Sequence, residues 1–540
     1  MARATHRDAA PAPAPAPTVA VTSESTVTAA DYIGPDACGA CHPAEHAKWQ
    51  QSLHRVMNQR AEDAGAIIGD FATTLEYGGG SVTFAHDAAA YTMTVRRGHP
   101  RDGNDDAITY RVTRTIGQRS LQEYVGIADG TTTEVRLPFA WWPRRRGWFP
   151  QPYFDPWLAE ADVDPYARVT EPWAERCPWC HSTYPFEQRL ARGGGHGVEQ
   201  FVASDPASGA PAVPAAGSVH AQVTVGISCE SCHLGGRAHA ATGAAMHFLP
   251  GGVTLAAAAP ARAGFAVERT TPAIVNAVCT QCHSGPSPRW PDRSSTRNSS
   301  EGLDLAASPC TTARCIDCHD PHTGGADEPR AIAACIRCHA PLGDATAAAE
   351  HAGAGHATVS CLDCHMPRVV MGVDRFVRSH RISAPTDRAQ LAAGAPNACG
   401  LCHLDRSIRW TLAALRARYH VQIAAHSLDA GHAYPDLDAP VGAAWLASKQ
   451  PFVRIAAAAA YARFPLTPHA LPALLAGLDD ELPHVRAWTA FAVETILGRT
   501  LATSEYDPRA PGPRRRAHLE LLADSVRRNR ADPRQAKALK

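Results

Sequence analysis

The 540-residue sequence lacks several features that would point to other classes of protein. No run of about 18 apolar residues occurs, so no membrane-spanning helix is predicted. The 52 basic side chains are balanced by 52 acidic ones, which leaves no excess of positive charge for a nucleic-acid partner. Methionine is scarce, with six residues in all, so it can supply few metal ligands.

The N-terminal segment also lacks the apolar core of a secretory signal peptide. Residues 1–30 instead combine a few charged side chains with an Ala-Pro repeat. That composition predicts a disordered linker over residues 1–30.

One pattern, C-x-x-C-H, is abundant and occurs eight times. We number the copies motifs 1 to 8 in chain order. Their cysteines are, in order, Cys38 and Cys41, Cys177 and Cys180, Cys229 and Cys232, Cys279 and Cys282, Cys315 and Cys318, Cys335 and Cys338, Cys361 and Cys364, and Cys399 and Cys402. Their histidines are His42, His181, His233, His283, His319, His339, His365 and His403.

This spacing is the attachment signal for haem c. Each cysteine can form a thioether with the same porphyrin, and the histidine that follows can bind its iron. Zinc sites also use paired cysteines, but they do not need a histidine directly after the second one. A disulfide framework is equally disfavoured in a chain of this length. We therefore predict eight covalently attached haem c groups, each with one iron.

Attachment of haem c takes place outside the cytoplasm, so we expect an exported protein that is periplasmic or extracellular. The haem propionates would make the loaded protein acidic. The expected partners are redox proteins, such as other cytochromes or a quinol-linked membrane complex, and the protein could also form a homo-oligomer or filament.

The second axial ligand of each iron must come from elsewhere in the chain. Nineteen histidines remain after the motif histidines are removed, so coordination by two histidines should dominate over coordination by methionine. The predicted ligands are His54, His239, His322, His351, His356 and His380, with His220 and His247 as weaker alternatives. The histidines expected to play no such role are His420, His426, His432, His469, His484 and His518.

The spacing of the motifs predicts the organisation of the chain. The linker over residues 1–30 is followed by a segment with motif 1 (31–60), a β-rich insert (61–150), a seven-haem region (151–410), and an α-helical domain with a basic tail (411–540). The predicted fold is mainly α and irregular, with a small antiparallel β insert and a C-terminal helical domain.

The β insert is predicted from alternating apolar residues over 81–95 and 108–112, separated by turn sequences such as Gly78-Gly79-Gly80. The segment 141–150 is rich in tryptophan and proline. We expect it to pack over a haem face, and a ligand-binding role for its tryptophans is the alternative.

The C-terminal region is predicted to be helical and repetitive. The sequence Pro-x-Val-Arg begins at Pro451 and again at Pro483, 32 residues later, with alanine-rich helices following. This spacing resembles HEAT repeats, whose concave face often binds a partner. A helical cap that shields the last haem is an equal alternative.

Cys310 is the odd cysteine, and we expect a free, partly buried thiol there, or else an extra ligand.

The chain resembles the doubled-CxxCH multihaem cytochromes that are fused to tetratricopeptide or HEAT repeats. The residues that carry the resemblance are Trp49-x-x-Ser52-x-His54, Gly226-Ile227-Ser228 before motif 3, Asp320-Pro321-His322 after motif 5, Met366-Pro367 after motif 7, and Pro396-Asn397-Ala398 before motif 8. The resemblance implies covalent haem c, export and electron transfer, and it names no substrate.

These observations favour an octahaem electron carrier in which haems with two histidine ligands pass electrons along the chain. The alternative is a multihaem oxidoreductase, similar to hydroxylamine oxidoreductase, that acts on a small nitrogen or sulfur compound at one iron with an open site. No C-x-x-C-K motif of the nitrite reductase type occurs, and Tyr419, Tyr434 and Tyr461 would be the places to look for a haem-tyrosine crosslink. A binding scaffold with structural haems is a third hypothesis.

Overall fold

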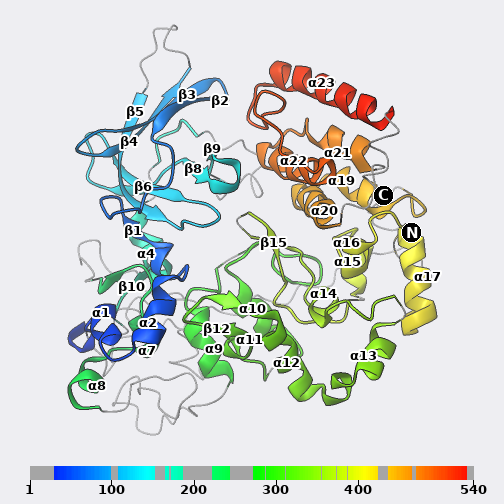
Figure 1. Ribbon diagram of the computed structural model, residues 1–540, viewed down its shortest axis with the longest axis horizontal. Coiled ribbons are helices and arrows are strands. Elements are labelled where there is room, and N and C mark those ends of the chain that lie inside the picture. Colours follow the sequence, from blue (N-terminus) through cyan, green and yellow to red (C-terminus); the bar gives the residue numbers. More distant parts are fainter. Residues whose placement is uncertain are drawn as a thin grey trace, which may run out of the picture.

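The computed structural model describes residues 29–98, 107–151, 165–169, 172–185, 222–243, 272–285, 287–310, 312–353, 355–372, 374–385, 387–423, 428, 434, 436–464 and 470–531. In Figure 1 a β sheet lies at the upper left, the C-terminal helices lie at the upper right, and the segments that carry the motifs form the lower part. Most of the linker predicted over 1–30 lies outside the described residues.

The predicted antiparallel sheet is confirmed and is larger than expected. It has seven strands in the order β2-β3-β4-β5-β6-β7, with β1 paired to β5. The strands are β1 (Gln59–Arg60), β2 (Ala72–Tyr77), β3 (Gly80–His86), β4 (Tyr91–Arg97), β5 (Ala107–Ile116), β6 (Glu123–Ala128) and β7 (Glu134–Arg136).

The alternation that predicted the sheet also explains its core. Val82, Phe84 and Met93 point to one face and are almost completely buried. Gly78 and Gly79 form the turn between β2 and β3 with positive φ angles of 56° and 81°, a conformation that glycine adopts without steric cost.

A separate hairpin is formed by β8 (Phe139–Trp142) and β9 (Gly147–Pro150), joined by the 3-10 helix η4 (Pro143–Arg145). The Trp148 ring stacks on Phe84 of the sheet with 3.6 Å between ring centroids. The Trp142 ring lies 5.2 Å from that of Phe491, in a C-terminal helix. Trp142 and Trp148 thus pack on other aromatic rings of the protein, and the expectation that the segment packs over a haem face stays a prediction.

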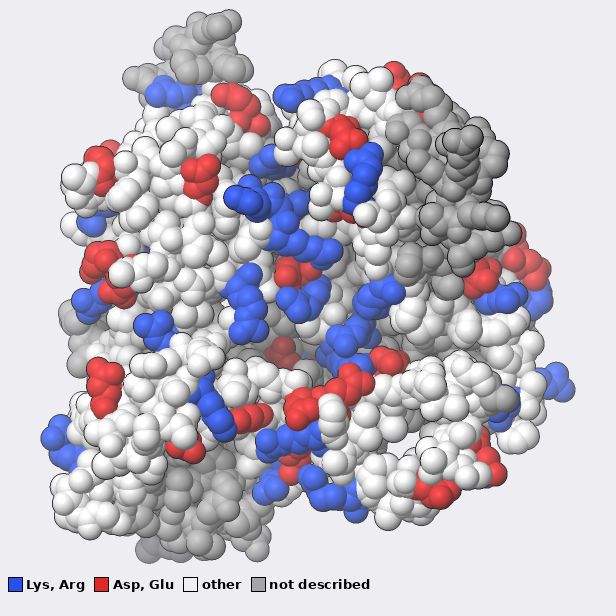
Figure 2. All heavy atoms as spheres, in the orientation of Figure 1, with Lys and Arg blue, Asp and Glu red and all other residues white. Residues whose placement is uncertain are grey.

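The hairpin joins the sheet to the C-terminal helices. The Arg145 guanidinium lies 2.8 Å from the Glu494 carboxylate and donates a hydrogen bond of 3.0 Å to the Ala487 carbonyl. Arg509 donates to the Trp148 carbonyl at 3.1 Å. Figure 2 shows basic side chains gathered along this boundary between the sheet and the helices.

The motifs lie on short helices, as the sequence predicts. The helices of this region, some of which carry the motifs, are η1 (Ala29–Asp31), α1 (Pro35–Gly39), α2 (Pro43–Gln50), η2 (Arg55–Met57), α3 (Trp173–Arg176), α4 (Pro178–His181), α7 (Glu230–His233), α8 (Arg237–Thr242), α9 (Pro272–Thr280), α10 (Glu301–Ala306), α11 (Cys315–Cys318), α12 (Glu328–Cys338), η5 (Ala340–Gly343), α13 (Ala345–Ala352), α14 (Cys361–His365), α15 (Arg388–Ala392) and α16 (Ala398–Cys402). Short strand pairs separate some of them, namely β10 (Ser182–Thr183) with β11 (Thr224–Val225), β12 (His319–Asp320) with β13 (Gly325–Ala326), and β14 (Val370–Met371) with β15 (Phe376–Val377).

The C-terminal part is helical. Its helices are α17 (Ile408–Tyr419), α19 (Val441–Leu446), α20 (Pro451–Arg463), α21 (Leu471–Gly477), α22 (Pro483–Leu497) and α23 (Gly512–Ala531). Their hydrophobic core also includes Val370, Phe376 and Leu401 from the segments around motifs 7 and 8. One core thus extends on both sides of the boundary predicted at residue 410.

The two Pro-x-Val-Arg sequences make the same contacts 32 residues apart. Arg454 donates to the carbonyl oxygens of Ser448 and Lys449, which lie six and five residues before it. Arg486 donates in the same way to those of Asp480 and Glu481. The sequence repeat is therefore also a structural repeat at these positions.

Among the residues that the structure describes, no helix combines the length and apolar character required to cross a bilayer.

Candidate haem centres

Each motif begins in or beside a helical turn, which explains how its side chains converge. In motifs 1, 3 and 4 the histidine N–H donates to the carbonyl of the first cysteine, four residues earlier, at 2.9–3.0 Å. Residues three and four apart lie on the same side of a helix. Both thiols and the imidazole are thereby presented to one ligand.

Motif 5 departs from this pattern. Its helix α11 ends at Cys318, and His319 is extended, with φ −109° and ψ 142°. The turn is held from outside by Asn276, whose side-chain oxygen accepts a hydrogen bond of 2.8 Å from the Cys315 N–H.

Four motif histidines face a second imidazole that lies nearly parallel to their own. The pairs, with the distances between ring centroids and the angles between ring planes, are His42 with His239 (6.1 Å, 18°), His233 with His322 (6.4 Å, 12°), His319 with His380 (6.0 Å, 18°) and His365 with His351 (6.1 Å, 13°). In a fifth pair, His403 with His356, the centroids are 6.0 Å apart and the rings are inclined by 74°.

These distances fit one iron between each pair of rings. Metal–nitrogen bonds of about 2.0 Å on opposite sides of one metal place two imidazole centroids about 6.3 Å apart. Direct stacking would bring the rings much closer, as the 3.6 Å between Phe84 and Trp148 illustrates. The five pairs therefore leave the space that a haem iron needs.

His54, which follows motif 1 in the sequence, lies near His283 of motif 4. Burial and the charge of nearby His283 lower the pKa of His54 to about 4. The Pro321 backbone also contacts its ring. His54 and His283 are thus the two histidines brought together at motif 4.

The histidines of motifs 2 and 6 are in different surroundings. His181 is buried beside the Trp173 ring at 5.8 Å, and burial lowers its pKa to about 4. His339 is exposed. Within the described part of the chain, neither faces a second imidazole, and the predicted ligands His220 and His247 lie outside that part.

Several ring nitrogens are held by backbone oxygens. The Nδ1 atom of His365 lies 2.9 Å from the Ser383 carbonyl, that of His356 lies 3.3 Å from the Ala352 carbonyl, and that of His181 lies 3.4 Å from the Met57 carbonyl. An Nδ1–H that donates in this way fixes the tautomer and leaves Nε2 free for a metal.

His283 has a carboxylate in this position. Its Nδ1 lies 3.0 Å from Oε2 of Glu301. Burial opposes charge on both groups, but their contact raises the pKa of His283 to about 9 and lowers that of Glu301 to about 2. Glu301 could not be recognised from the sequence, because it lies 18 residues after His283 and in no motif.

Contacts between cysteines indicate which motifs are neighbours. The Cys38 thiol donates a hydrogen bond to that of Cys229, which raises the pKa of Cys38 and lowers that of Cys229. The thiols of Cys279 and Cys315 show the same relation. Motif 1 therefore lies against motif 3, and motif 4 against motif 5.

A second set of contacts extends the series to motif 8. Burial, followed by the charge of a neighbouring thiol, raises the pKa of three cysteines: Cys318 next to Cys335, Cys335 next to Cys361, and Cys399 next to Cys364. Motifs 5, 6, 7 and 8 therefore follow one another in space as they do in sequence. Cys310, which is partly buried, also lies near Cys335.

Motif 2 contacts motif 4, and motif 3 lies beside motif 5. The Cys180 thiol lies 3.9 Å from the Gln281 carbonyl, and the Cys282 thiol lies 3.9 Å from the Trp179 carbonyl, so motif 2 lies against motif 4. His322, which faces His233 of motif 3, follows His319 of motif 5 by three residues. All eight motifs thus belong to one connected array.

A buried carboxylate fastens motif 1 to motif 3. Glu230, inside motif 3, accepts hydrogen bonds from the backbone N–H groups of Ile33 at 3.1 Å, Gly34 at 2.8 Å and Gly236 at 2.9 Å. This role could not be recognised from the sequence, because Glu230 occupies a variable position of C-x-x-C-H.

The tyrosines named for a crosslink differ in position. The Tyr419 hydroxyl donates to the Ala352 carbonyl at 2.6 Å, and its ring lies near Cys364 and Cys399. Tyr434 and Tyr461 belong to the C-terminal hydrophobic core. Tyr419 thus lies beside motif cysteines, and Cys399 also packs against the core that contains Tyr434 and Tyr461.

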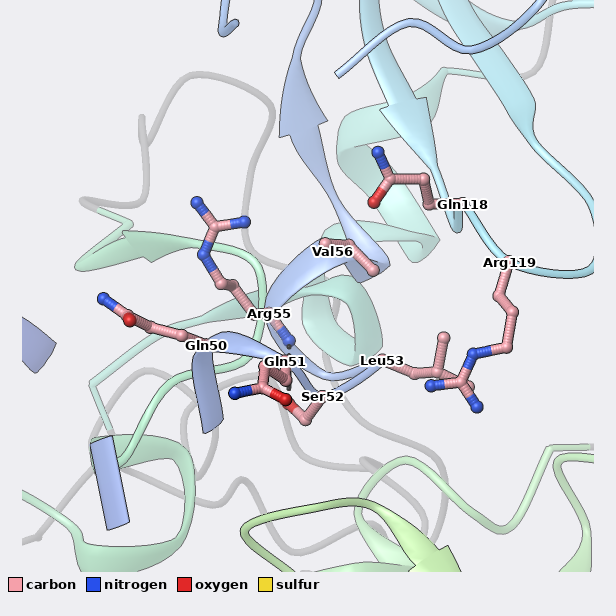
Figure 3. A pocket seen from close by; sticks show the side chains of 8 residues that line it. All are labelled: Gln50, Gln51, Ser52, Leu53, Arg55, Val56, Gln118 and Arg119. Atoms are coloured by element: carbon pink, nitrogen blue, oxygen red, sulfur yellow. Dashed lines mark hydrogen bonds between the residues drawn. The ribbon is translucent and has the colours of Figure 1, made fainter. Parts of the chain in front are cut away.

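A cavity of about 360 Å³ lies beside His54. It is lined by Gln50, Gln51, Ser52, Leu53, Arg55, Val56, Gln118 and Arg119. Figure 3 shows that the guanidinium groups of Arg55 and Arg119 point in different directions, so the polar groups do not converge on one ligand.

Gly226 fixes the backbone between motif 3 and His54. Its φ is +82°, and a Cβ atom there would overlap the Arg55 carbonyl oxygen. The adjacent Ile227 N–H donates to the His54 carbonyl at 3.0 Å. We expect Gly226→Ala to lower the unfolding free energy by more than the roughly 1–3 kcal/mol that backbone strain alone costs, measured by thermal and denaturant unfolding.

Gly243→Ala is the matched control, because Gly243 has φ +69° but open space around its Cβ position. The Gly243→Ala variant should therefore lose stability through backbone strain alone, without steric overlap. Equal losses from the two substitutions would contradict a role for the close approach to Arg55.

The sequence was compared with known proteins. The cytochrome c552 family model matches residues 347–449, which include motifs 7 and 8 and the histidines His351, His356 and His380. The crystal structure of the outer cell wall cytochrome OcwA is similar over 92% of this chain and 100% of that chain, with a TM-score of 0.38 and 15% sequence identity. No curated protein sequence matches. The C-x-x-C-H motifs and the family match together support a c-type cytochrome that acts in electron transfer through covalently bound haem c.

Proposed function

We propose that this chain is an octahaem c-type cytochrome that carries electrons along an array of haems, most of them bound by two histidines. The observation that supports this most directly is the set of five imidazole pairs with centroids 6.0–6.4 Å apart. Haem c, when bound, supplies one-electron redox chemistry.

The residues of the chain have three tasks in this proposal. The paired cysteines anchor each porphyrin through thioethers, and the motif histidines bind the iron on one side. The second ligands are His239 for motif 1, His322 for motif 3, His54 for motif 4, His380 for motif 5, His351 for motif 7 and His356 for motif 8. Two strong-field imidazoles make an iron six-coordinate and hold its potential low.

The contacts between motifs support transfer along the array. They run from motif 2 through motifs 4, 5, 6 and 7 to motif 8, with motifs 1 and 3 joined at motif 5. The β insert and the HEAT-like helices at the C-terminal side would then offer docking surfaces for redox partner proteins. We place the protein in the cell envelope or outside the cell.

Electron paramagnetic resonance of the purified, haem-loaded protein tests the proposal, together with intact-mass analysis. We expect a mass increase of eight haems and a ferric spectrum dominated by low-spin signals. Carbon monoxide should bind to at most the two sites, motifs 2 and 6, for which no second histidine is assigned.

Two results would contradict the proposal. A mass without covalent additions would exclude haem c. A dominant high-spin ferric signal, with rapid carbon monoxide binding at most sites, would exclude coordination by two histidines and favour the alternative, a multihaem oxidoreductase with open-site iron.

A further inference from the structure

The hydrogen-bond partner of Nδ1 differs among the histidines of the array. The Nδ1 atoms of His365, His356 and His181 lie near neutral backbone carbonyls. His283 of motif 4 instead lies 3.0 Å from a carboxylate oxygen of Glu301. This difference in charge sets motif 4 apart.

The structure holds Glu301 in place from both sides. Its other carboxylate oxygen accepts a hydrogen bond of 2.9 Å from the Ser299 N–H. The next residue, Gly302, donates its N–H to the His283 carbonyl at 2.8 Å, and a Cβ atom at Gly302 would overlap the Thr280 side chain. Helix α10 is thus packed tightly against motif 4, and Glu301 is directed at the imidazole.

The carboxylate of Asp320 also lies near a proposed ligand, but a lysine compensates its negative charge. Glu301 has no such compensation from the residues that the structure describes. Asp320 lies 3.3 Å from Nδ1 of His322, but the Lys48 ammonium lies 3.3 Å from the same carboxylate. The groups that act most strongly on Glu301 are the imidazoles of His283 and His380, one from motif 4 and one facing motif 5. The negative charge of Glu301 therefore lies between two neighbouring sites without a lysine or arginine partner among the contacts described.

A carboxylate that accepts the Nδ1–H bond makes an imidazole a stronger electron donor to its metal. Stronger donation favours the ferric over the ferrous state. We infer that Glu301 lowers the reduction potential of the iron bound by His283 and makes motif 4 a low-potential step between motifs 2 and 5. This inference rests on the proposed function, because it assumes an iron at His283.

Electron transfer through motif 4 would change only the oxidation states of two irons. One electron arrives from a ferrous neighbour, which becomes ferric, and the iron at His283 is reduced; no bond is formed or broken. A low potential at this point makes the arrival of the electron unfavourable and its departure toward motif 5 favourable. Glu301 would thereby make motif 4 the step that limits flow from motif 2.

The test is a spectroscopic redox titration of the haem-loaded Glu301→Gln variant. Glutamine can keep the hydrogen bond through its side-chain oxygen while the charge is removed. We expect the reduction equilibrium of one site to shift about tenfold toward the ferrous state, which is about 59 mV for one electron. Glu301→Asp retains the charge and should restore most of the wild-type potential.

The control is Glu505→Gln, which removes the same charge from an exposed pair with Arg499 in the C-terminal region. A Glu301→Gln protein whose potentials match those of this control, with low-spin spectra intact, would overturn the inference and leave the proposed function standing. If the wild-type protein itself lacked low-spin haem, the proposed function would fail first. Should Glu301→Gln fail to load haem, an unchanged potential in Glu301→Asp together with a raised one in Glu301→Ala would support the inference, and equal potentials would overturn it.

Discussion

Replacing His351 with alanine is expected to convert one of the eight sites from low-spin to high-spin iron. His351 faces His365 of motif 7, with ring centroids 6.1 Å apart. Without this imidazole the proposed iron loses its sixth ligand and gains an open position. The measurements are electron paramagnetic resonance of the ferric protein and carbon monoxide titration of the ferrous protein, which should bind about one additional equivalent.

The fold should tolerate this substitution. Helix α13 is rich in alanine, which has the highest helix propensity, and its N-terminus is capped by the Asp344 side chain, which accepts from two backbone N–H groups. Glu350→Ala, one residue earlier on the same exposed helix, is the matched control and should leave the spectra unchanged. His351→Met should instead keep the iron low-spin and raise its potential. Unaltered spectra in His351→Ala would show that His351 is not a ligand.

The largest loss of stability is expected from Arg486→Ala in the C-terminal helices. Its side chain is buried, with 5% exposure, and donates to the carbonyl oxygens of Pro508, Asp480 and Glu481 at 2.6–2.8 Å. Each buried acceptor left without a donor costs about 1–3 kcal/mol. We expect a loss of about 3–5 kcal/mol, measured by denaturant unfolding or by hydrogen exchange of α22.

Arg454→Ala should be almost as costly, because Arg454 makes the equivalent contacts in the first repeat and also binds the buried Asp480 carboxylate at 2.7 Å. Arg499→Ala provides the control. Arg499 pairs with Glu505 at the surface, where both side chains are at least 40% exposed, and such pairs contribute about 1 kcal/mol or less. A similar loss in all three variants would contradict the structural role of the repeated arginine.

Local patterns predicted the parts of the structure that depend on neighbours in sequence. Alternation around Val82 and Phe84 predicted strands, and the glycines before them predicted the turn, because both signals are short-range. The sequence predicted a mainly α and irregular fold, and the structure has short helices around the motifs. The partners of the tryptophan segment could not be read from the sequence, because an aromatic ring packs equally well on a porphyrin or on Phe84 and Phe491.

The pairing of the histidines could not be read from the sequence. His54 follows motif 1 along the chain but lies beside His283 of motif 4, and His239 follows motif 3 but faces His42 of motif 1. These partners are set by how distant segments fold together. The roles of Glu230 and Glu301 could not be predicted for the same reason, since a single acidic residue forms no recognisable sequence pattern.

The order of each motif and its partner histidine along the sequence affects when each haem site could be completed. For motifs 4, 7 and 8 the partner imidazole precedes the motif, whereas for motifs 1, 3 and 5 it follows, most distantly from His42 to His239. A polypeptide that is translocated with its N-terminus leading would therefore deliver motifs 4, 7 and 8 after their partner histidines. The earliest porphyrins would wait half-ligated until downstream segments emerged, so a cleaved or stalled chain would be left with reactive iron at the end that was synthesised first.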